Sequence, residues 1–406
     1  MKKLRVGILF GGRSGEHEVS LLSAASVLKA INRKKYEVVP IGITKEGRWV
    51  TSSDAERLLT GDSAPAERNL RAGDPETTSA AAVLARGESV IVPPVPSKSK
   101  TGALVPFETE ARGLEMQASG GMGPALKLDV IFPVLHGTFG EDGTIQGLFE
   151  LAGIAYVGSG VLGSAAGMDK DVMKRLFAAA KLPIPKHVSF LRADWEANPK
   201  KTIAKIEAAL NYPLFVKPAN LGSSVGITKA HDCKELGPAI KVAAGFDRKI
   251  VVEQGVGGKK GKARELEVAV LGNDKPEASV VGEIVPGKEF YDYEAKYLSE
   301  GSDLIIPAKL TRQQAKEIRE MAIAAFQACD CSGLARVDFL MDPQTGSGPT
   351  GRIYLNEINT LPGFTSISMY PKLWAASGVA YPELIDRLIG LALERRAEKD
   401  RTSYCR

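Results

Sequence analysis

The chain has 406 residues, of which 44% are hydrophobic and 25% are charged. This length exceeds the usual size of one domain, so we expect two or three lobes, each with a core of its own. The 53 basic and 48 acidic residues nearly cancel, and no long basic run indicates a nucleic-acid surface. No segment approaches the roughly 20 apolar residues of a membrane span. We therefore predict a cytoplasmic protein that binds neither nucleic acid nor membranes.

The N-terminal region, residues 1–158, has the pattern of an open parallel α/β sheet. An apolar run at 4–10 ends at two glycines, and apolar positions then recur at helical spacing from Val19 to Ile31. A second apolar run at 36–43 follows at the distance expected of a βαβ unit. Open sheets of this kind bind ligands in the loops that follow their strands. We therefore expect a ligand site at the strand ends of this lobe.

The remaining regions differ from one another in composition. Residues 52–125 are rich in Ala, Gly, Ser and Pro, and we interpret them as a long insertion that is partly loop. Residues 159–255 mix short helical and strand patterns, which is typical of a small α+β lid. Residues 256–396 hold several apolar strands and helices, and residues 397–406 form a charged tail. The predicted fold class is therefore α/β followed by α+β.

Two adjacent strand patterns carry the strongest local prediction, GLARVDFLM and RIYLNEINT, joined by the turn-rich stretch DPQTGSGPTG. Such a connection favours an antiparallel hairpin. Alternate residues of a strand share a face, so Arg336 lies beside Asp338, and Glu357 beside Asn359. If the strands pair in that register, two carboxylates, an amide and a guanidinium converge, a set that suits Mg²⁺ and a phosphate. The alternative is a solvated hairpin face with a salt bridge.

Three further stretches are candidates for binding loops. Lys217 ends a strand and continues into PANLGSSVG, whose backbone N–H groups could cover phosphates; the alternative is a plain turn. The aromatic cluster FYDYEAKY at 290–297 suits a binding loop or a packed surface turn. Glu16, in GGRSGEHEVS, lies beside a helix start, and its alternative role is stabilisation of the first helical turn. Each pattern alone leaves both interpretations open.

Taken in order, the motifs of the chain resemble those of the D-alanine:D-alanine ligase family, which belongs to the ATP-grasp superfamily. The resemblance spans nearly the whole chain and rests on GGRSGEHEVS, HGTFGEDG, MDK at 168–170, FVKPANLGSSVG, VVEQ at 251–254, FYDYEAKY, LARVDF and NEINTLPGFTSIS. It implies a substrate-binding domain at 1–158, an ATP-grasp lid at 159–255 and an ATP-grasp catalytic domain at 256–396. Each motif is weak alone, whereas the ordered set is specific.

The resemblance also implies a role for individual residues. The ATP contacts would be Lys170, Lys217, Ser223, Ser224, Glu253, Glu265 and Lys296. The D-alanine contacts would be Glu16, His136, Arg336, Gly363 and Ser368. Residues acting in catalysis would be Glu16, Ser223, Tyr297, Arg336 and Gly363. Two Mg²⁺ ions, with Mn²⁺ as a substitute, would bind Asp338, Glu357 and Asn359.

The activity implied is the ATP-dependent joining of two D-alanine molecules through an acyl phosphate, for peptidoglycan precursors, by a homodimer. Alternatives are another ATP-grasp carboxylate–amine ligase, a ligase of the D-alanine:D-lactate type, and a non-catalytic nucleotide-binding regulator. Tyr297 favours the dipeptide, since relatives that use D-lactate tend to differ there. A regulator would be expected to have lost a metal carboxylate or the arginine, and this sequence retains both.

Overall fold

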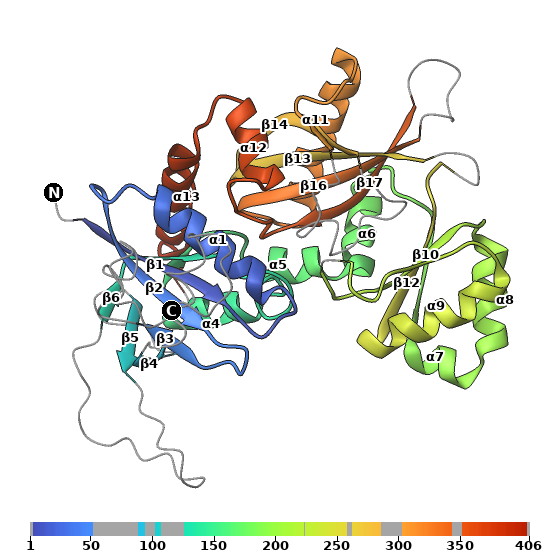
Figure 1. The fold of residues 1–406 in the computed structure, drawn as a ribbon, viewed down its shortest axis with the longest axis horizontal. Helices are drawn as coiled ribbons and strands as arrows, with labels where there is room; N and C mark the ends of the chain where they lie inside the picture. The colour runs from blue at the N-terminus through green and yellow to red at the C-terminus, as the bar shows by residue number, and fades with distance from the viewer. Residues whose placement is uncertain are drawn as a thin grey trace, which may run out of the picture. The chain divides into compact units, whose positions relative to one another are not determined.

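The computed structural model describes residues 3–51, 88–93, 102–106, 126–222, 224–257, 262–285, 303–342 and 351–403. The chain divides into two compact units. Unit 1 comprises Met1–Val161 together with Leu361–Arg406, and unit 2 comprises Leu162–Thr360. Figure 1 labels most of the helices and strands of both units.

A single mixed sheet forms the centre of unit 1. Its strand order is β6-β5-β4-β3-β2-β1-β7-β8. The parallel strands are β1 (Leu4–Gly11), β2 (Tyr36–Ile43), β7 (Val130–Pro133) and β8 (Ala155–Tyr156). The antiparallel strands are β3 (Trp49–Thr51), β4 (Glu88–Ile91), β5 (Gly102–Pro106) and β6 (Leu126–Leu128). The predicted parallel lobe is therefore present, and strands within the predicted insertion extend its sheet on the β2 side.

Among the described residues, four helices pack in unit 1, namely α1 (His17–Ala30), α4 (Thr144–Ala152), α12 (Met369–Ala376) and α13 (Tyr381–Lys399). Helix α13 contacts α1 and strands β7 and β8, although it lies more than two hundred residues after them in sequence. The expected division had placed residues 361–396 with the preceding catalytic strands. They belong to unit 1 instead, because the apolar stripe of α13, which includes Leu384 and Leu388, is buried there.

The first half of unit 2 is a four-stranded antiparallel sheet with helices on it. The strand order is β11-β10-β12-β9, comprising β11 (Thr228–Ala230), β10 (Leu214–Pro218), β12 (Lys249–Gln254) and β9 (His187–Leu191). The helices are α7 (Arg192–Ala197), α8 (Pro199–Ala209) and α9 (Cys233–Phe246). Trp195, Ile206 and Ile240 from these helices join Val216 and Val252 from the strands in one apolar core.

The second half of unit 2 is a five-stranded antiparallel sheet in the order β15-β14-β13-β16-β17. The strands are β15 (Asp303–Ile305), β14 (Glu277–Val285), β13 (Arg264–Gly272), β16 (Gly333–Asp342) and β17 (Arg352–Asn359). The helices are α5 (Val161–Met168), α6 (Lys170–Ala179) and α11 (Arg312–Ala328). Phe177 of α6 and Phe326 of α11 pack with Val337 and Phe339 of β16, so one sheet face forms the core. The opposite face remains available for polar side chains.

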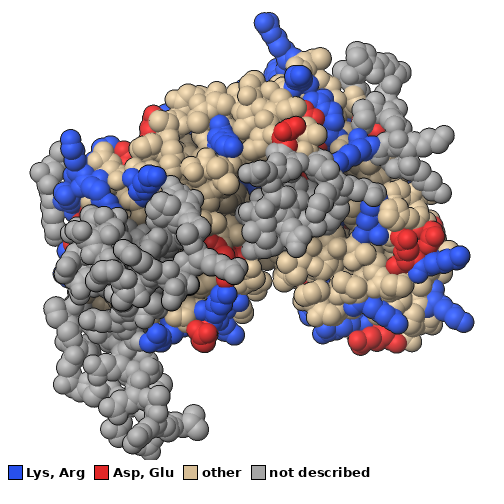
Figure 2. Space-filling view, viewed as in Figure 1, with Lys and Arg blue, Asp and Glu red and all other residues tan. Residues whose placement is uncertain are grey.

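No helix among the described residues is long and apolar enough to cross a membrane. On the face drawn in Figure 2, basic and acidic side chains of the described residues are interspersed. This mixing agrees with the near balance of 53 basic and 48 acidic residues in the sequence.

Candidate active site

The first group of predicted site residues lies in unit 1, at the loop that joins β1 to α1. Gly11 and Gly12 both have positive φ, 85° and 104°, which lets the chain turn sharply after the strand. Ser20 of α1 fastens the turn, because its hydroxyl accepts from the Gly11 N–H at 2.8 Å and donates to the Val134 carbonyl at 2.6 Å. The predicted order of strand, glycine turn and helix is confirmed.

Glu16 occupies the N-cap position of α1, yet its side chain makes no capping hydrogen bond. The carboxylate is turned instead towards Gly137, where a Cβ atom on that glycine would lie 2.7 Å from Oε2 of Glu16. Ser14 joins the two segments, since its hydroxyl donates to the His136 carbonyl at 2.6 Å and accepts from the Glu16 N–H. The capping role considered for Glu16 therefore does not account for its side chain.

His136 is buried and links two loops of unit 1. Its Nδ1–H donates to the Leu361 carbonyl at 2.9 Å, which leaves Nε2 to accept from the Ser23 hydroxyl at 2.9 Å. The Ser23 oxygen in turn accepts from the Phe364 N–H at 3.3 Å. Burial lowers the pKa of His136 despite the nearby Glu16 carboxylate, so the imidazole is neutral at physiological pH. A neutral ring can hold both hydrogen bonds at once.

The same loop carries Gly363 and Ser368. A Cβ atom on Gly363 would lie 3.1 Å from the Ser368 hydroxyl, so a side chain at Gly363 would crowd that hydroxyl. The Ser368 hydroxyl also contacts Thr365, accepting from its N–H at 3.1 Å and lying 2.7 Å from its hydroxyl. Unit 1 thus brings together four predicted site residues. They are Glu16, His136, Gly363 and Ser368.

The second group lies in unit 2, where Glu253 of β12 is held between two lysines. Its carboxylate is 3.2 Å from Nζ of Lys174 and 3.0 Å from Nζ of Lys217, and both Glu253 and Lys174 are almost completely buried. Burial alone would raise the pKa of Glu253, but the two ammonium groups outweigh it and lower that pKa to about 2. Glu253 also raises the pKa of Lys217 against the effect of burial. The predicted ATP residues Lys217 and Glu253 are therefore direct partners.

Lys174 was not among the predicted site residues. It lies on α6 one turn after Lys170, and its Nζ also donates to the Asn356 carbonyl at 3.0 Å. Burial lowers the pKa of Lys174, and Glu253 opposes this. The available sequence signal was the i, i+4 spacing of Lys170 and Lys174, on a helix that also buries the apolar residues Met173 and Phe177. It predicts a helix face that is partly cationic.

Lys170 and the glycine-rich loop are also in contact. The Nζ of Lys170 donates to the Leu221 carbonyl at 2.7 Å, and its backbone N–H donates to the Ala219 carbonyl at 3.0 Å. Ser224 adopts a positive φ of 60° in a tight turn closed by bonds from Val225 and Ile227. Lys170 therefore links the start of α6 to the beginning of the loop that follows β10.

The predicted hairpin register is confirmed. Strands β16 and β17 pair with Arg336 opposite Asn359 and Asp338 opposite Glu357, before a β-bulge shifts the register. These four side chains lie on the sheet face opposite the apolar core and are half-buried. Glu265, the predicted ribose contact on β13, lies opposite Leu340, two residues from Asp338, and so shares this face.

Arg336 pairs with two carboxylates on this face. Its Nε and Nη2 donate to the two oxygens of Asp338, both at 2.7 Å, and its Nε lies 3.2 Å from Glu267 of β13. Burial opposes ionisation, but Asp338 and Glu267 raise the pKa of Arg336 well above its ordinary value. Glu267 is a further residue that the sequence patterns missed, because the order of β13 and β16 in the sheet was not evident from them.

The donor set on this face can be tested against Mg²⁺. No cluster of three or more His, Cys, Asp or Glu side chains with metal-binding geometry occurs in the described part of the chain. The predicted set holds only two carboxylates and one amide, Asp338, Glu357 and Asn359. This set suits Mg²⁺, which uses one or two carboxylates and completes its shell with phosphate oxygens and water. Each carboxylate oxygen has two lone-pair positions, so Asp338 can keep its arginine and still donate to a cation.

Ser223, Lys296 and Tyr297 lie outside the described residues, so the structure places the remaining predicted site residues only. Nine of these residues lie in unit 2, namely Lys170, Lys217, Ser224, Glu253, Glu265, Arg336, Asp338, Glu357 and Asn359.

Solved ligase structures share this architecture. The VanG D-Ala:D-Ser ligase from Enterococcus faecalis matches with a TM-score of 0.76 and 36% identity, covering 96% of this chain and 100% of that one. The D-alanine-D-alanine ligase from Coxiella burnetii matches with a TM-score of 0.76 and 31% identity, covering 98% and 97%. The fold and the site therefore define an ATP-dependent ligase with the ATP-grasp fold.

Sequence comparisons narrow this class to one family. Family models described as "D-ala D-ala ligase N-terminus" and "D-ala D-ala ligase C-terminus" match residues 5–159 and 176–390. Proteins named D-alanine--D-alanine ligase from Bacillus cytotoxicus and Natranaerobius thermophilus are 47% and 48% identical. These alignments cover 100% and 99% of this chain, and 99% and 98% of the relatives. The chain belongs to the D-alanine–D-alanine ligase family.

Proposed function

We propose that the chain joins two D-alanine molecules into D-alanyl-D-alanine, using ATP and two Mg²⁺ ions, as a step towards peptidoglycan precursors. The observation that carries the proposal is the register of β16 and β17, which sets Asp338 against Glu357 and Arg336 against Asn359. Family membership supports the substrate class, and the register supports the proposed site for phosphate chemistry. The proposed setting is a homodimer in the cytoplasm.

The ATP side of the proposed reaction belongs to unit 2. Lys170 and Lys217 would contact the phosphates, since both ammonium groups lie on the elements that frame the glycine-rich loop. Glu253 would serve the nucleotide with its backbone and would keep Lys217 charged with its carboxylate. Glu265 would bind the ribose hydroxyls from the polar face of β13. Ser223, Ser224 and Lys296 would complete the set from the neighbouring loops.

Asp338, Glu357 and Asn359 would hold Mg²⁺, with Mn²⁺ as a substitute. The bound ions would neutralise charge on the phosphate oxygens of ATP during transfer. Arg336 would face the transferring phosphate, where its rigid guanidinium can donate to two oxygens. Its pairing with Asp338 and Glu267 fixes the plane of the guanidinium before a ligand arrives.

The amino-acid side of the proposed reaction includes the loops of unit 1. Glu16 would bind the ammonium of the first D-alanine, in a hydrogen-bonded set with Ser223 and Tyr297. His136 would contact this substrate and hold the loop that carries Gly363. The backbone of Gly363 would stabilise an oxyanion, and Ser368 would hold the carboxylate of the second D-alanine.

The chemistry takes two steps because a free carboxylate is a poor electrophile. A carboxylate oxygen of the first D-alanine attacks the γ-phosphorus, and the bond from phosphorus to ADP breaks. The amine of the second D-alanine then attacks the acyl carbon, loses a proton and expels phosphate. Both steps accumulate negative charge, so lysine, arginine and backbone donors supply the main stabilisation.

The purified chain with ATP, Mg²⁺ and D-alanine tests the proposal, with ADP and dipeptide both measured. We expect D-alanine-dependent ADP release in equal amount with the dipeptide. The Glu357→Gln variant should lose turnover by about 100-fold or more, because it removes a charge from the proposed metal site. The matched control is Glu320→Gln, an identical change on the exposed face of α11, which should keep full activity.

Release of ADP without D-alanine, or full activity of Glu357→Gln, would contradict the proposal. The VanG neighbour is named as a D-Ala:D-Ser ligase, so D-serine and D-lactate belong in the assay as second substrates. A preference for D-serine or D-lactate over D-alanine would mean that the second substrate differs, while the reaction type stays the same.

A further inference from the structure

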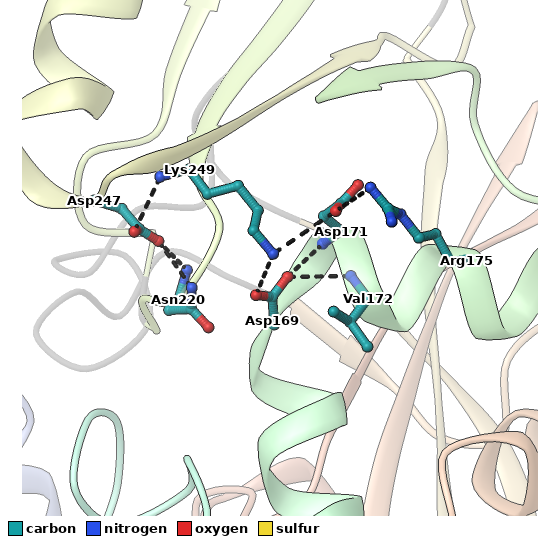
Figure 3. Close-up of polar contacts among 7 residues, drawn as sticks. All are labelled: Asp169, Asp171, Val172, Arg175, Asn220, Asp247 and Lys249. Carbon is teal, nitrogen blue, oxygen red and sulfur yellow. Dashed lines mark hydrogen bonds and ion pairs between the residues drawn. The ribbon is translucent and has the colours of Figure 1, made fainter. Parts of the chain in front are cut away.

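A cluster of charged and polar side chains lies in unit 2 where the starts of α6 and β12 meet the end of β10 (Figure 3). We call it the Lys249 cluster, and its members are Asp169, Asp171, Arg175, Asn220, Asp247 and Lys249. None of them has a role in the proposed reaction. The side chains of Lys249 and Asp169 are only 17% and 14% exposed, so this ion pair is largely withdrawn from water. Such pairs are screened less than surface pairs.

On the helix side, Asp169 determines how α6 begins. Its Oδ1 accepts from the backbone N–H groups of Asp171 and Val172, both at 3.1 Å, which makes Asp169 the N-cap. Its Oδ2 accepts from Nζ of Lys249 at 2.7 Å. Lys170 is the next residue, so the ion pair fixes the backbone from which the Lys170 side chain extends.

On the loop side, Asp247 fastens the residues that follow β10. Its Oδ2 accepts from the backbone and the side-chain amide of Asn220, at 2.7 and 3.0 Å, and its Oδ1 accepts from the Lys249 N–H at 3.1 Å. The Ala219 N–H donates to the Lys249 carbonyl at 3.0 Å, and the Ala219 carbonyl accepts from the Lys170 N–H at 3.0 Å. A continuous set of contacts therefore joins β12, the glycine-rich loop and α6.

We propose that Lys249, acting through Asp169, is a positioning residue for the nucleotide: it holds Lys170 and the loop residues 219–222 at one fixed spacing. The inference rests on the proposed function, in which both groups contact the ATP phosphates. Lys170 already reaches the loop, with its Nζ 2.7 Å from the Leu221 carbonyl. A shift of about 1 Å between two groups that share one ligand can cost roughly 100-fold in rate.

The competing explanation is that the cluster only stabilises unit 2. The pair of Arg175 and Asp171 separates the two explanations, because it belongs to the same cluster and helix. Arg175 lies 2.8 Å from Asp171, its side chain is 73% exposed, and the two are four residues apart on α6. Arg175→Met therefore removes an ion pair without cutting the link between β12 and α6.

The experiment compares the full-length chain with Lys249→Met, Asp169→Asn, their double variant, Lys249→Arg and Arg175→Met. Calorimetry measures the Kd of ADP with Mg²⁺ in the absence of D-alanine. Steady-state assays measure KM for ATP and for D-alanine separately, and thermal unfolding measures Tm.

We expect Lys249→Met to raise the Kd for ADP and the KM for ATP about tenfold and to change the KM for D-alanine less than about twofold. Lys249→Arg should recover most of the affinity, since a guanidinium can keep the pair with Asp169. The double variant should be no worse than Lys249→Met alone, because Lys249→Met already removes the contact of Lys249 with Asp169 at 2.7 Å and its longer contact with Asp171 at 3.7 Å. Arg175→Met should match the unaltered chain.

Three results would overturn the inference: unchanged ADP binding in Lys249→Met, an equal rise of both KM values, or the same losses in Arg175→Met. If Lys249→Met does not fold, Asp169→Asn, which keeps the side-chain shape, decides by the same criteria. A chain that binds ADP but forms no dipeptide would refute the proposed function while the ADP comparison still decides the role of Lys249.

Discussion

Lys174 illustrates at the residue scale how a fully buried charge is kept in unit 2. Its ammonium has two partners, the Glu253 carboxylate at 3.2 Å and the Asn356 carbonyl at 3.0 Å. Transferring an unpaired ammonium into this interior would cost several kcal/mol. The pairing therefore ties α6, β12 and β17 together at one point, and all three of these elements carry predicted site residues.

Removing Lys174 should weaken folding, with a dependence on pH. Lys174→Met leaves Glu253 with Lys217 only, so we expect the free energy of unfolding at pH 7 to fall by about 2–3 kcal/mol. Because the folded pKa of Glu253 is depressed from 4.5 to about 2, its contribution is complete above pH 4.5 and is lost as the pH falls towards 2. The variant should lose less stability over that interval, as measured by urea unfolding at each pH.

The control for this prediction is Lys316→Met on α11. Lys316 lies 3.8 Å from Glu320, and both side chains are 67% exposed. Exposed pairs of this kind contribute about 0.5 kcal/mol or less. A loss in Lys316→Met as large as that in Lys174→Met would mean that burial of the pair does not matter.

At the scale of elements, the hairpin of β16 and β17 shows what alternation in a sequence can predict. The period of two assigned Arg336 and Asp338 to one face, and the turn-rich connection favoured antiparallel pairing; both are confirmed. The bulge after Asp338 could not be predicted, because the stretch of connecting residues leaves several registers open. Glu267 was missed for a related reason: it joins Arg336 only because β13, distant in sequence, is the neighbouring strand.

The glycine at the end of β1 leads to a prediction about how closely β1 packs against β2. A Cβ atom on Gly11 would lie 2.2 Å from the Ile43 carbonyl oxygen on β2, and Gly11 also has a φ of 85°. Gly11→Ala should therefore lower the free energy of unfolding by about 3 kcal/mol or more, because a backbone atom cannot move aside. Thermal unfolding of the purified variant measures the loss.

Gly15 provides the comparison within the same loop. A Cβ atom there would have no heavy atom within 4 Å, and the residue does not have a positive φ of the kind seen at Gly11. Gly15→Ala should leave Tm within a few degrees of the original value. Equal losses of stability in Gly11→Ala and Gly15→Ala would show that the close approach of β1 to β2 does not cause the loss in Gly11→Ala.

At the scale of the whole molecule, the division into units was the least accessible feature of the sequence. The order of the motifs and the apolar patterns predicted an α/β lobe, a small α+β lid and a third region with an antiparallel hairpin. They gave no sign that residues 361–403 return to unit 1, since an amphipathic helix such as α13 can cover any apolar sheet face. The contacts of α13 with β7 and β8 settle this in the structure.

The discontinuous unit makes a prediction for native-state hydrogen exchange. Leu388 of α13 is completely buried, so Leu388→Ala should lower the stability of unit 1 by about 3 kcal/mol through loss of packing and a residual cavity. Exchange detected by mass spectrometry should accelerate in α13 and also in β7 and β8, because these elements open together. Peptides from β13 and β16 should keep their protection, since their core is a separate cluster. The control is Arg387→Ala, one residue earlier on the exposed face of α13, which should change none of these exchange rates. If Leu388→Ala accelerates exchange in α13 alone, the helix is only peripheral to the sheet.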